Sequence, residues 1–130
     1  MRARGFTLIE LLVVMFLIGL LTAVVLPSME RMARSSQLKT ERDAIVGRLG
    51  ELGYEAFLSG KSIVLPDSLS AVRATYPIEL PEGWELRMTK PVVYAFNGIC
   101  GGGNVALIAP DGVIEKFDLV PPSCELRSGN

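Results

Sequence analysis

Histidine is absent from the 130-residue sequence, and cysteine occurs only twice, at Cys100 and Cys124. Without histidine, the chain cannot build a Ser-His-Asp triad, an HExxH zinc site or most of the general-base chemistry that operates near neutral pH. Two cysteines without histidine do not complete an ordinary four-ligand zinc site. The sequence therefore predicts a protein that is not an enzyme and that holds no metal or other cofactor.

Clustered positive charge is also missing. The chain carries 13 Lys and Arg against 14 Asp and Glu, a formal net charge of −1, and no basic run. Proteins that bind nucleic acids neutralise phosphates with gathered lysines and arginines. The tail beyond Cys124 offers only Arg127, so a nucleic-acid partner is not expected.

What the sequence does contain is a long apolar run near its start, over residues 6–26. Within these 21 residues only two threonines, one glycine and Glu10 are not plainly apolar. An α-helix of this length spans about 31 Å, which matches the hydrocarbon thickness of a bilayer. The run therefore predicts a transmembrane helix.

Two simpler interpretations of this run explain less. A secretory signal peptide has a shorter apolar stretch, followed by a small-residue cleavage site, and no such site follows here. A plain membrane anchor fits the length but gives no reason for Glu10, because a carboxylate within the span costs about 2–3 kcal/mol on insertion scales. Glu10 is therefore a candidate functional residue that requires a partner.

The segment Gly5-Phe6-Thr7-Leu8-Ile9-Glu10 resembles the N-terminal signal of type IV pilins and type II secretion pseudopilins. The resemblance covers residues 1–30. It implies that a prepilin peptidase removes residues 1–5 as a leader by cutting after Gly5, and that the new amino terminus at Phe6 is N-methylated. Pro27 stands where many pilins carry a proline that kinks the helix.

The resemblance also supplies a partner for Glu10, namely the N-terminal amine at Phe6 of a neighbouring subunit in the filament. Both charges are unfavourable in lipid, and pairing offsets part of each penalty. The alternative is that Glu10 reaches back to the nearby membrane–water interface. The partners implied are other pilin or pseudopilin subunits, the prepilin peptidase, an inner-membrane assembly platform and the lipid bilayer.

The orientation in the membrane is not decided by charge, because basic residues lie on both sides of the span. The resemblance places the leader in the bacterial cytoplasm and the remainder beyond a single inner-membrane span, with the head in the periplasm and later in the filament. A disulfide would agree with that compartment.

Residues 27–58 predict an amphipathic continuation of the helix. Apolar residues recur on one helical face, at Leu38, Ile45, Leu49, Leu52 and Ala56. Charged residues occupy the opposite positions, at Lys39, Glu41, Arg42, Asp43, Arg48 and Glu51. Gly53 is expected to cap the helix C-terminus, whereas Gly47 and Gly50 allow either a helix end or the close approach of another backbone.

Residues 59–130 predict a β-rich globular head. Strands are expected over residues 61–65, 76–80, 84–88, 92–96, 104–109 and 113–120, and the last two form a hairpin about Pro110-Asp111-Gly112. In the second hairpin arm Val113, Phe117 and Leu119 share a face, with Glu115 as its polar exception. The fold expected is α+β, with a long helix packed on an antiparallel sheet of four or five strands.

Cys100 and Cys124 flank this hairpin and are either free thiols or a disulfide. A bridge would close a loop of about 25 residues and stabilise the fold by roughly 3 kcal/mol. A C-terminal disulfide loop resembles that of many type IV pilins, and we expect the bridge. The glycines at 101–103 lack the Lys-Ser/Thr of a phosphate loop, and we expect a flexible turn.

A calcium site is a further alternative, since some major pseudopilins bind calcium in a C-terminal loop. Asp111, Glu115 and Asp118 are the candidate ligands, but their spacing is not that of an EF-hand. Glu115 and Asp118 would lie on opposite faces of a regular strand. We expect a solvated strand surface there instead.

The function expected is that of a structural filament subunit. The short chain and sheet-rich head resemble a minor pseudopilin of the type II protein secretion system, broadly the H-type (GspH/FimT-like) group. The alternative is a minor or major type IV pilin of a surface pilus that serves adhesion, twitching or DNA uptake.

Overall fold

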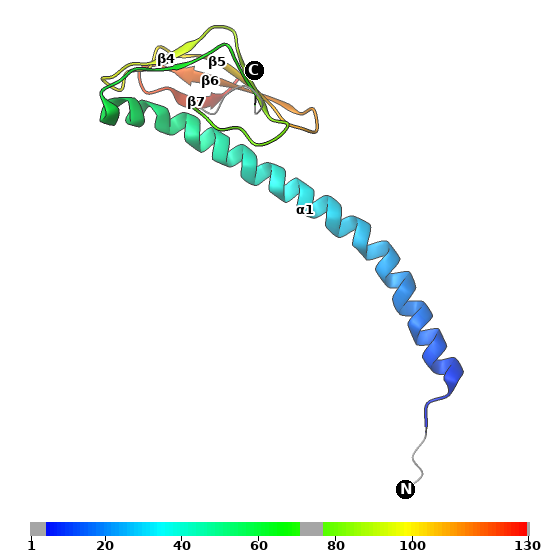
Figure 1. Ribbon diagram of the computed structural model, residues 1–130. Coiled ribbons are helices and arrows are strands. Elements are labelled where there is room, and N and C mark those ends of the chain that lie inside the picture. The colour runs from blue at the N-terminus through cyan, green and yellow to red at the C-terminus, as the bar shows by residue number, and fades with distance from the viewer. Residues whose placement is uncertain (1–4, 71–76, 130) are drawn as a thin grey trace. The chain divides into compact units, whose positions relative to one another are not determined.

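The computed structural model describes residues 5–70 and 77–129. One long helix precedes seven short strands (Figure 1). The elements are α1 (Leu8–Ser59), β1 (Ile63–Leu65), β2 (Ser68–Ser70), β3 (Glu85–Met88), β4 (Val92–Tyr94), β5 (Gly103–Ile108), β6 (Ile114–Val120) and β7 (Glu125–Ser128). The expected α+β, pilin-like architecture, a long apolar helix followed by antiparallel sheets, is confirmed.

The chain divides into two compact units, Met1–Leu38 and Lys39–Asn130. Helix α1 begins in the first unit and ends in the second. In the first unit, every described residue up to position 37 is exposed, so the chain itself offers this part of α1 no tertiary packing. The helix runs through Pro27, which cannot donate a backbone hydrogen bond; a kink there stays a prediction.

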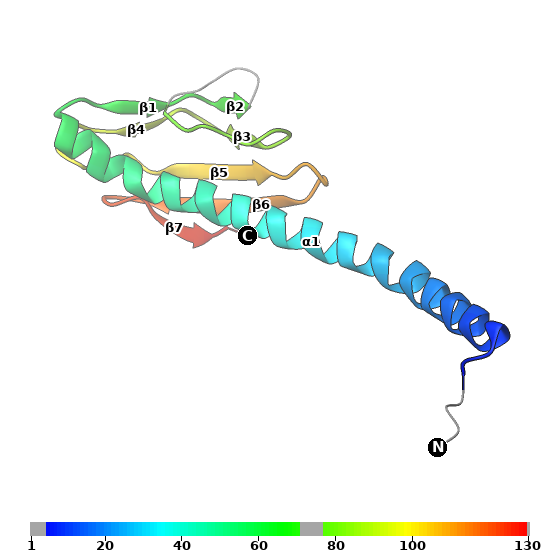
Figure 2. The ribbon, with the colours of Figure 1, turned by 60° about the horizontal axis from the view of Figure 1, so that its bottom comes forward.

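In the second unit, the C-terminal part of α1 packs along one face of the sheet (Figure 2). The buried helix residues are Ile45, Leu49, Leu52, Gly53 and Ala56. Their spacing of three and four residues is one helical face. The predicted face is therefore correct, with Leu38 half-buried at its start.

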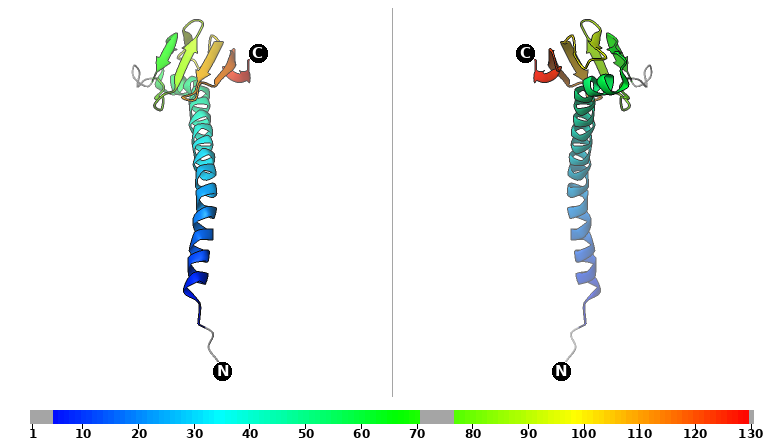
Figure 3. Two further views of the ribbon diagram at one scale, coloured as in Figure 1. Left: turned by 90° about the vertical axis from the view of Figure 1, so that its right-hand side faces the viewer. Right: turned by 90° about the vertical axis from the view of Figure 1, so that its left-hand side faces the viewer.

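The strands form two antiparallel sheets where the sequence predicted one. A two-stranded sheet pairs β1 with β4, and a five-stranded sheet has the order β2-β3-β5-β6-β7. Figure 3 shows the strands of the head side by side above the end of α1. The β5–β6 hairpin is the longest pairing, from Gly103 opposite Leu119 to Ile108 opposite Ile114.

Five of the predicted strands are present, four of them shortened and β5 displaced by one residue, and β2 and β7 were not predicted. The prediction of a strand over residues 76–80 is wrong for 77–80, which form a bend followed by irregular chain; Tyr76 lies outside the described residues. Ile78 and Leu80 are nevertheless buried. The apolar residues that suggested a strand fill the core without joining a ladder.

Two charged residues that were predicted to lie on the solvent side of α1 instead contact the sheet. The indole Nε1 of Trp84 donates a 2.7 Å hydrogen bond to Oε2 of Glu41. Arg42 donates from Nε and Nη2 to Oε2 of Glu115, at 3.0 and 2.8 Å. Both helix residues are half-buried, because they flank the buried face and their long side chains reach over its edges.

Tyr94 joins α1 to the small sheet from within the core. Its side chain is fully buried, and its hydroxyl donates a 3.3 Å hydrogen bond to the Leu49 carbonyl oxygen. Burial raises the pKa of Tyr94 to about 12, because the phenolate would lose its hydration.

Gly53 does not cap the helix, so that prediction is wrong. It lies inside α1, where a Cβ would stand 3.5 Å from the Gly98 carbonyl oxygen and 3.7 Å from the Tyr94 ring. The helix ends instead at Ser59, and Gly60 follows with φ of +63°, a common helix terminator. Gly47 and Gly50 are exposed, with no atom within 4 Å of an added Cβ.

Val113 also departs from the prediction, because it lies in the hairpin turn and is exposed. Phe117 and Leu119 are buried as expected. Glu115 is the predicted polar exception on their face, and the Arg42 guanidinium explains its presence. That guanidinium also lies over the Phe117 ring, 5.4 Å from its centroid.

Candidate assembly and membrane-anchoring site

The Gly5–Phe6 junction lies in irregular chain ahead of α1. Phe6 is 81% exposed, and no atom lies within 4 Å of a Cβ placed on Gly5. The backbone at the predicted cleavage point is therefore accessible on both sides. Residues 1–4 of the predicted leader lie outside the described residues.

The first turn of α1 is organised by Thr7. Its carbonyl oxygen accepts the backbone N–H groups of Glu10 and Leu11, at 3.1 and 3.3 Å. Its hydroxyl oxygen also accepts the Glu10 N–H, at 3.4 Å. This is the arrangement of a helix N-cap. The predicted cleavage at Gly5 would leave one residue, Phe6, ahead of the cap.

Thr7 is a residue that the sequence reasoning missed. The signal was present, because Thr7 and Glu10 stand in the Thr-x-x-Glu spacing of a capping box. A carboxylate in the first turn also interacts favourably with the positive end of the helix dipole. Glu10 therefore lies at a position that a helix start favours for local reasons.

The Glu10 carboxylate nevertheless has no hydrogen-bond or ion-pair partner among the described residues. The hydroxyls farther along the helix are satisfied internally. Thr22 Oγ1 donates to the carbonyl oxygens of Ile18 and Gly19, each at 2.9 Å, and Ser28 Oγ donates to that of Val25 at 2.7 Å. In the apolar part of α1, Glu10 is therefore the side chain whose polar group requires a partner from outside this part of the chain.

Helix α1 has the length and composition to cross a membrane, and it is the one such helix in the part of the chain that the structure describes. None of its most apolar 18-residue stretch is buried inside the chain. Large side chains such as Phe16, Ile18 and Leu21 are more than half exposed. An apolar surface of this extent needs lipid or other subunits to cover it.

In the second unit, the expected disulfide between Cys100 and Cys124 is present, with its Cα atoms 5.6 Å apart. Both residues are buried. The backbone N–H of Cys100 donates a 2.7 Å hydrogen bond to the Pro122 carbonyl oxygen. The bridge thus joins the chain that follows β4 to the turn between β6 and β7.

In the glycine run beside Cys100, where a flexible turn was expected, Gly101 is exposed but Gly102 and Gly103 are tightly packed. Gly102 is buried and has φ of +71°. A Cβ there would lie 2.6 Å from Pro121 Cγ and 2.8 Å from the Leu119 carbonyl oxygen. Only glycine fits this close approach.

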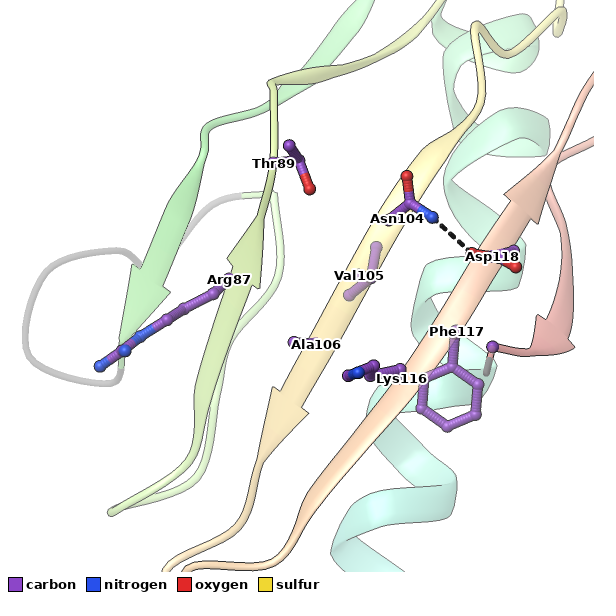
Figure 4. Close-up of a pocket in the computed structure, with 9 residues that line it drawn as sticks. Arg87, Thr89, Asn104, Val105, Ala106, Lys116, Phe117 and Asp118 are labelled. Atoms are coloured by element: carbon purple, nitrogen blue, oxygen red, sulfur yellow. Dashed lines mark hydrogen bonds between the residues drawn. The ribbon is translucent and has the colours of Figure 1, made fainter.

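A hollow of about 200 Å³ lies on the side of the five-stranded sheet where Arg87, Ala106 and Lys116 occupy neighbouring strands (Figure 4). The Asn104 amide donates a 2.6 Å hydrogen bond to the Asp118 carboxylate. Asp118 is the one carboxylate in the lining. The hollow therefore lacks the paired carboxylates, or the nucleophile beside a base, that acid–base or covalent catalysis uses.

The three acidic residues considered as calcium ligands have separate environments. Glu115 pairs with Arg42 and Asp118 with Asn104, while Asp111 accepts the Val113 backbone N–H at 3.2 Å. Over residues 5–70 and 77–129, no group of three or more Cys, Asp or Glu side chains is placed to hold a metal ion.

Residues 1–26 match a protein family described as the prokaryotic N-terminal methylation motif. Neither a curated protein nor a solved structure matches the chain. The matched stretch contains Gly5, Phe6, Thr7 and Glu10, and it ends where the apolar run ends.

The motif, the apolar helix and the antiparallel sheets together are consistent with a type IV pilin-like protein. A pilin motif implies processing by a prepilin peptidase and assembly with other pilin subunits. The same motif and helix fit a membrane-anchored protein with a single span.

Proposed function

We propose that this chain is a structural subunit of a type IV pilus-like filament, and that it is a minor pseudopilin of the type II protein secretion system. The observation that carries the proposal is the methylation motif over residues 1–26, with the unpartnered Glu10 carboxylate in the first turn of an exposed apolar helix. A packed soluble domain would have no use for either feature.

Four segments divide the work of the subunit. The leader, residues 1–5, is removed after Gly5, and residues 6–26 hold the precursor in the inner membrane as a single span. Residues 27–58 continue the helix, and residues 59–130 form a head in the periplasm. After cleavage, the assembly platform extracts the subunit into the filament, where helices pack together.

Glu10 acts in this assembly through the amine that cleavage creates. The new N-terminus at Phe6 is charged, and methylation leaves the amine able to carry that charge. Pairing with Glu10 of a neighbour offsets part of the desolvation penalty of both groups. Because only one stagger of neighbouring helices brings the two together, the pair also sets the register of the filament.

The subunit has no catalytic role in this proposal. The chain lacks histidine, and the hollow of Figure 4 holds a single carboxylate that already accepts a hydrogen bond. The subunit acts through its contact surfaces. The apolar helix contacts lipid and neighbouring helices, and the disulfide-linked head forms the rest of the subunit.

One observation favours a second candidate, a minor or major type IV pilin of a surface pilus. The Cys100–Cys124 bridge closes a C-terminal loop, as in many pilins that the sequence resembles. The two candidates share the N-terminal motif, so the choice between them depends on the head and on the machine that it joins.

The primary test is mass spectrometry of the mature N-terminus in cells that contain a prepilin peptidase. We expect a chain that begins with a methylated Phe6, and a precursor that accumulates when Gly5 is replaced by valine. A chain that retains Met1, or that is cut near Ala33, would contradict the proposal.

Deletion of the gene separates the two filaments. Loss of protein secretion with normal surface pili supports the pseudopilin, whereas loss of twitching, adhesion or DNA uptake with normal secretion supports the surface pilin. Complementation with the wild-type chain and with Glu10→Ala is the matched control for each phenotype.

A further inference from the structure

The arginines of the described chain fall into two groups. Those in the unit Lys39–Asn130 each lie within 4.0 Å of a carboxylate oxygen, in the pairs Arg42–Glu115, Arg48–Glu55, Arg87–Glu85 and Arg127–Glu125. Arg31 and Arg34, in the unit Met1–Leu38, are exposed and have no ion pair or hydrogen bond with any described residue. Two guanidinium groups thus stand unpartnered on the same stretch of helix.

Arg31 and Arg34 share one face of α1. Residues three apart on a helix are neighbours on its surface, and both lie just beyond the apolar run, which ends at Leu26. At 1.5 Å per residue, their Cα atoms stand about 8 and about 12 Å past Leu26. Side chains on a helix lean toward its N-terminus, so both guanidiniums lean back toward the end of the apolar run.

That level corresponds to the headgroup layer of a bilayer, if residues 6–26 span its hydrocarbon core. The core is about 30 Å thick, and the headgroups bring the total to about 40–45 Å. The neighbouring positions carry Met29 and Met32, which are 63% and 77% exposed. Basic and apolar side chains together are the composition that suits the boundary between headgroups and acyl chains.

We propose that Arg31 and Arg34 bind the phosphate groups of bilayer lipids where α1 leaves the membrane, and so set the depth of the helix. The guanidinium fork matches a phosphate through two parallel hydrogen bonds. This inference rests on the membrane anchorage in the proposed function. To that function the inference adds a contact with lipid, which the subunit makes before it joins a filament.

The depth has a consequence for Glu10. Along a continuous helix, Glu10 lies 21 residues before Arg31, a distance of about 32 Å. If the arginines lie among the headgroups of one leaflet, Glu10 is placed near the opposite boundary of the hydrocarbon core. The arginines would thus hold the Glu10 carboxylate, and the amine at Phe6, close to water until a neighbouring subunit pairs with them.

A carboxylate of a second copy is the competing partner. Glu30 is exposed and lies four residues before Arg34, yet the two form no salt bridge within the chain. Lipid phosphate is favoured for the isolated subunit because it surrounds the helix at this level, whereas Glu30 of another copy arrives only on assembly.

The test measures the proximity of guanidinium carbon to lipid phosphorus. The full chain, labelled with 13C at the arginine guanidinium carbon, is reconstituted into vesicles of phosphatidylcholine and phosphatidylglycerol in phosphate-free buffer, and 13C–31P dipolar dephasing is recorded by solid-state NMR. All samples carry Arg2→Gln and Arg4→Gln, so that the leader contributes no signal. We expect dephasing in the chain that carries only these two substitutions, called the background chain. We expect the dephasing to be lost when Arg31→Gln/Arg34→Gln is added.

The matched control is Arg87→Gln/Arg127→Gln, which removes two exposed arginines of the head and should leave the dephasing unchanged. Dephasing that persists in Arg31→Gln/Arg34→Gln, or that is absent from the background, overturns the inference. Dephasing that appears only after Glu30→Gln also overturns it and assigns the arginines to a second copy. In a further control, the chain is placed in a detergent that has no phosphate group, and inorganic phosphate is added. This sample must show no dephasing, since a signal there would mean that the arginines form a general anion site.

A carbonate wash of the same vesicles distinguishes failure of the lipid-phosphate inference from failure of the proposed function. If the background chain resists extraction but shows no dephasing, only the lipid-phosphate contact is wrong. If the chain washes off the vesicles, the membrane anchorage is wrong, and the inference is overturned with it.

Discussion

The backbone N–H of Glu10 points at Thr7, whose carbonyl and hydroxyl oxygens lie 3.1 and 3.4 Å from it. This relationship starts α1 at Leu8, two residues after Phe6, and leaves the Glu10 carboxylate itself without a partner among the described residues. Local capping thus accounts for where the helix begins, and the carboxylate remains available for the contact between subunits that we propose.

Glu10→Ala should leave membrane insertion and cleavage after Gly5 intact and should abolish incorporation into filaments, because the Phe6 amine loses its partner. Resistance to carbonate extraction measures insertion, and sheared or cross-linked filaments measure incorporation. Glu30→Gln, which removes a carboxylate outside the apolar run, is the matched control and should assemble normally. Normal incorporation of Glu10→Ala would remove the pairing argument.

Gly102→Ala should destabilise the head by about 3 kcal/mol, since a Cβ collides with Pro121 and the backbone adopts a positive φ. Gly53→Ala is the matched control. Its Cβ would only touch neighbours at 3.5 Å, and alanine favours the helix by about 1 kcal/mol, so stability should be equal or higher. Urea unfolding of the full chain in detergent, followed by Trp84 fluorescence, measures both. Equal losses in the two variants would contradict this packing.

The head should lose stability as the pH rises from about 10 to about 12, and Tyr94 is the cause. Its pKa is raised to about 12 by burial, against an ordinary value of about 10. The folded state therefore keeps a proton that the unfolded state releases in this window. The stabilisation is fully present below about pH 10 and decreases by up to about 3 kcal/mol as the pH approaches 12.

Urea unfolding at a series of pH values checks this dependence. In Tyr94→Phe, the free energy of unfolding should fall less steeply with rising pH than in the wild type, because phenylalanine does not titrate. Tyr54→Phe, which alters an exposed tyrosine, should keep the wild-type slope. Parallel curves for wild type and Tyr94→Phe would show that Tyr94 ionises as readily in the folded chain as in the unfolded one.

Removal of the disulfide should lower the free energy of unfolding by roughly 3 kcal/mol, because its loop restricts the unfolded chain. The cysteines are 24 residues apart. Cys100→Ser/Cys124→Ser and the fully reduced wild type should give the same urea midpoint, below that of the oxidised chain. An unchanged midpoint in the double variant would mean that the bridge contributes no net stability.

The Arg42–Glu115 pair should contribute about 1 kcal/mol of coupling energy, since it joins two half-buried groups through two hydrogen bonds. A double-mutant cycle with Arg42→Gln and Glu115→Gln isolates this coupling from the contact of Arg42 with Phe117. The Arg127–Glu125 pair, at 3.9 Å and with both side chains mostly exposed, is the control and should show almost none. Coupling of equal size in the two pairs would contradict the role assigned to burial.

The sequence by itself determined the features that depend on contiguous residues. The apolar run of residues 6–26, the Gly5–Glu10 segment and the buried helical face through Ile45 and Ala56 follow from local pattern and periodicity. The β5–β6 hairpin also followed, because its turn and both arms are adjacent in the chain. The Thr7 cap was equally local and could have been predicted from the capping-box spacing.

Only the tertiary structure decided which residues distant in sequence meet. Glu41 and Arg42 looked like solvent-side charges until Trp84 and Glu115 were placed beside them, and Gly53 looked like a cap until Gly98 and Tyr94 were found against it. The short strands β2 and β7 depend on ladder partners that periodicity over three or four residues cannot reveal. The contacts of Glu41, Arg42 and Gly53 join segments dozens of residues apart, which no local propensity encodes.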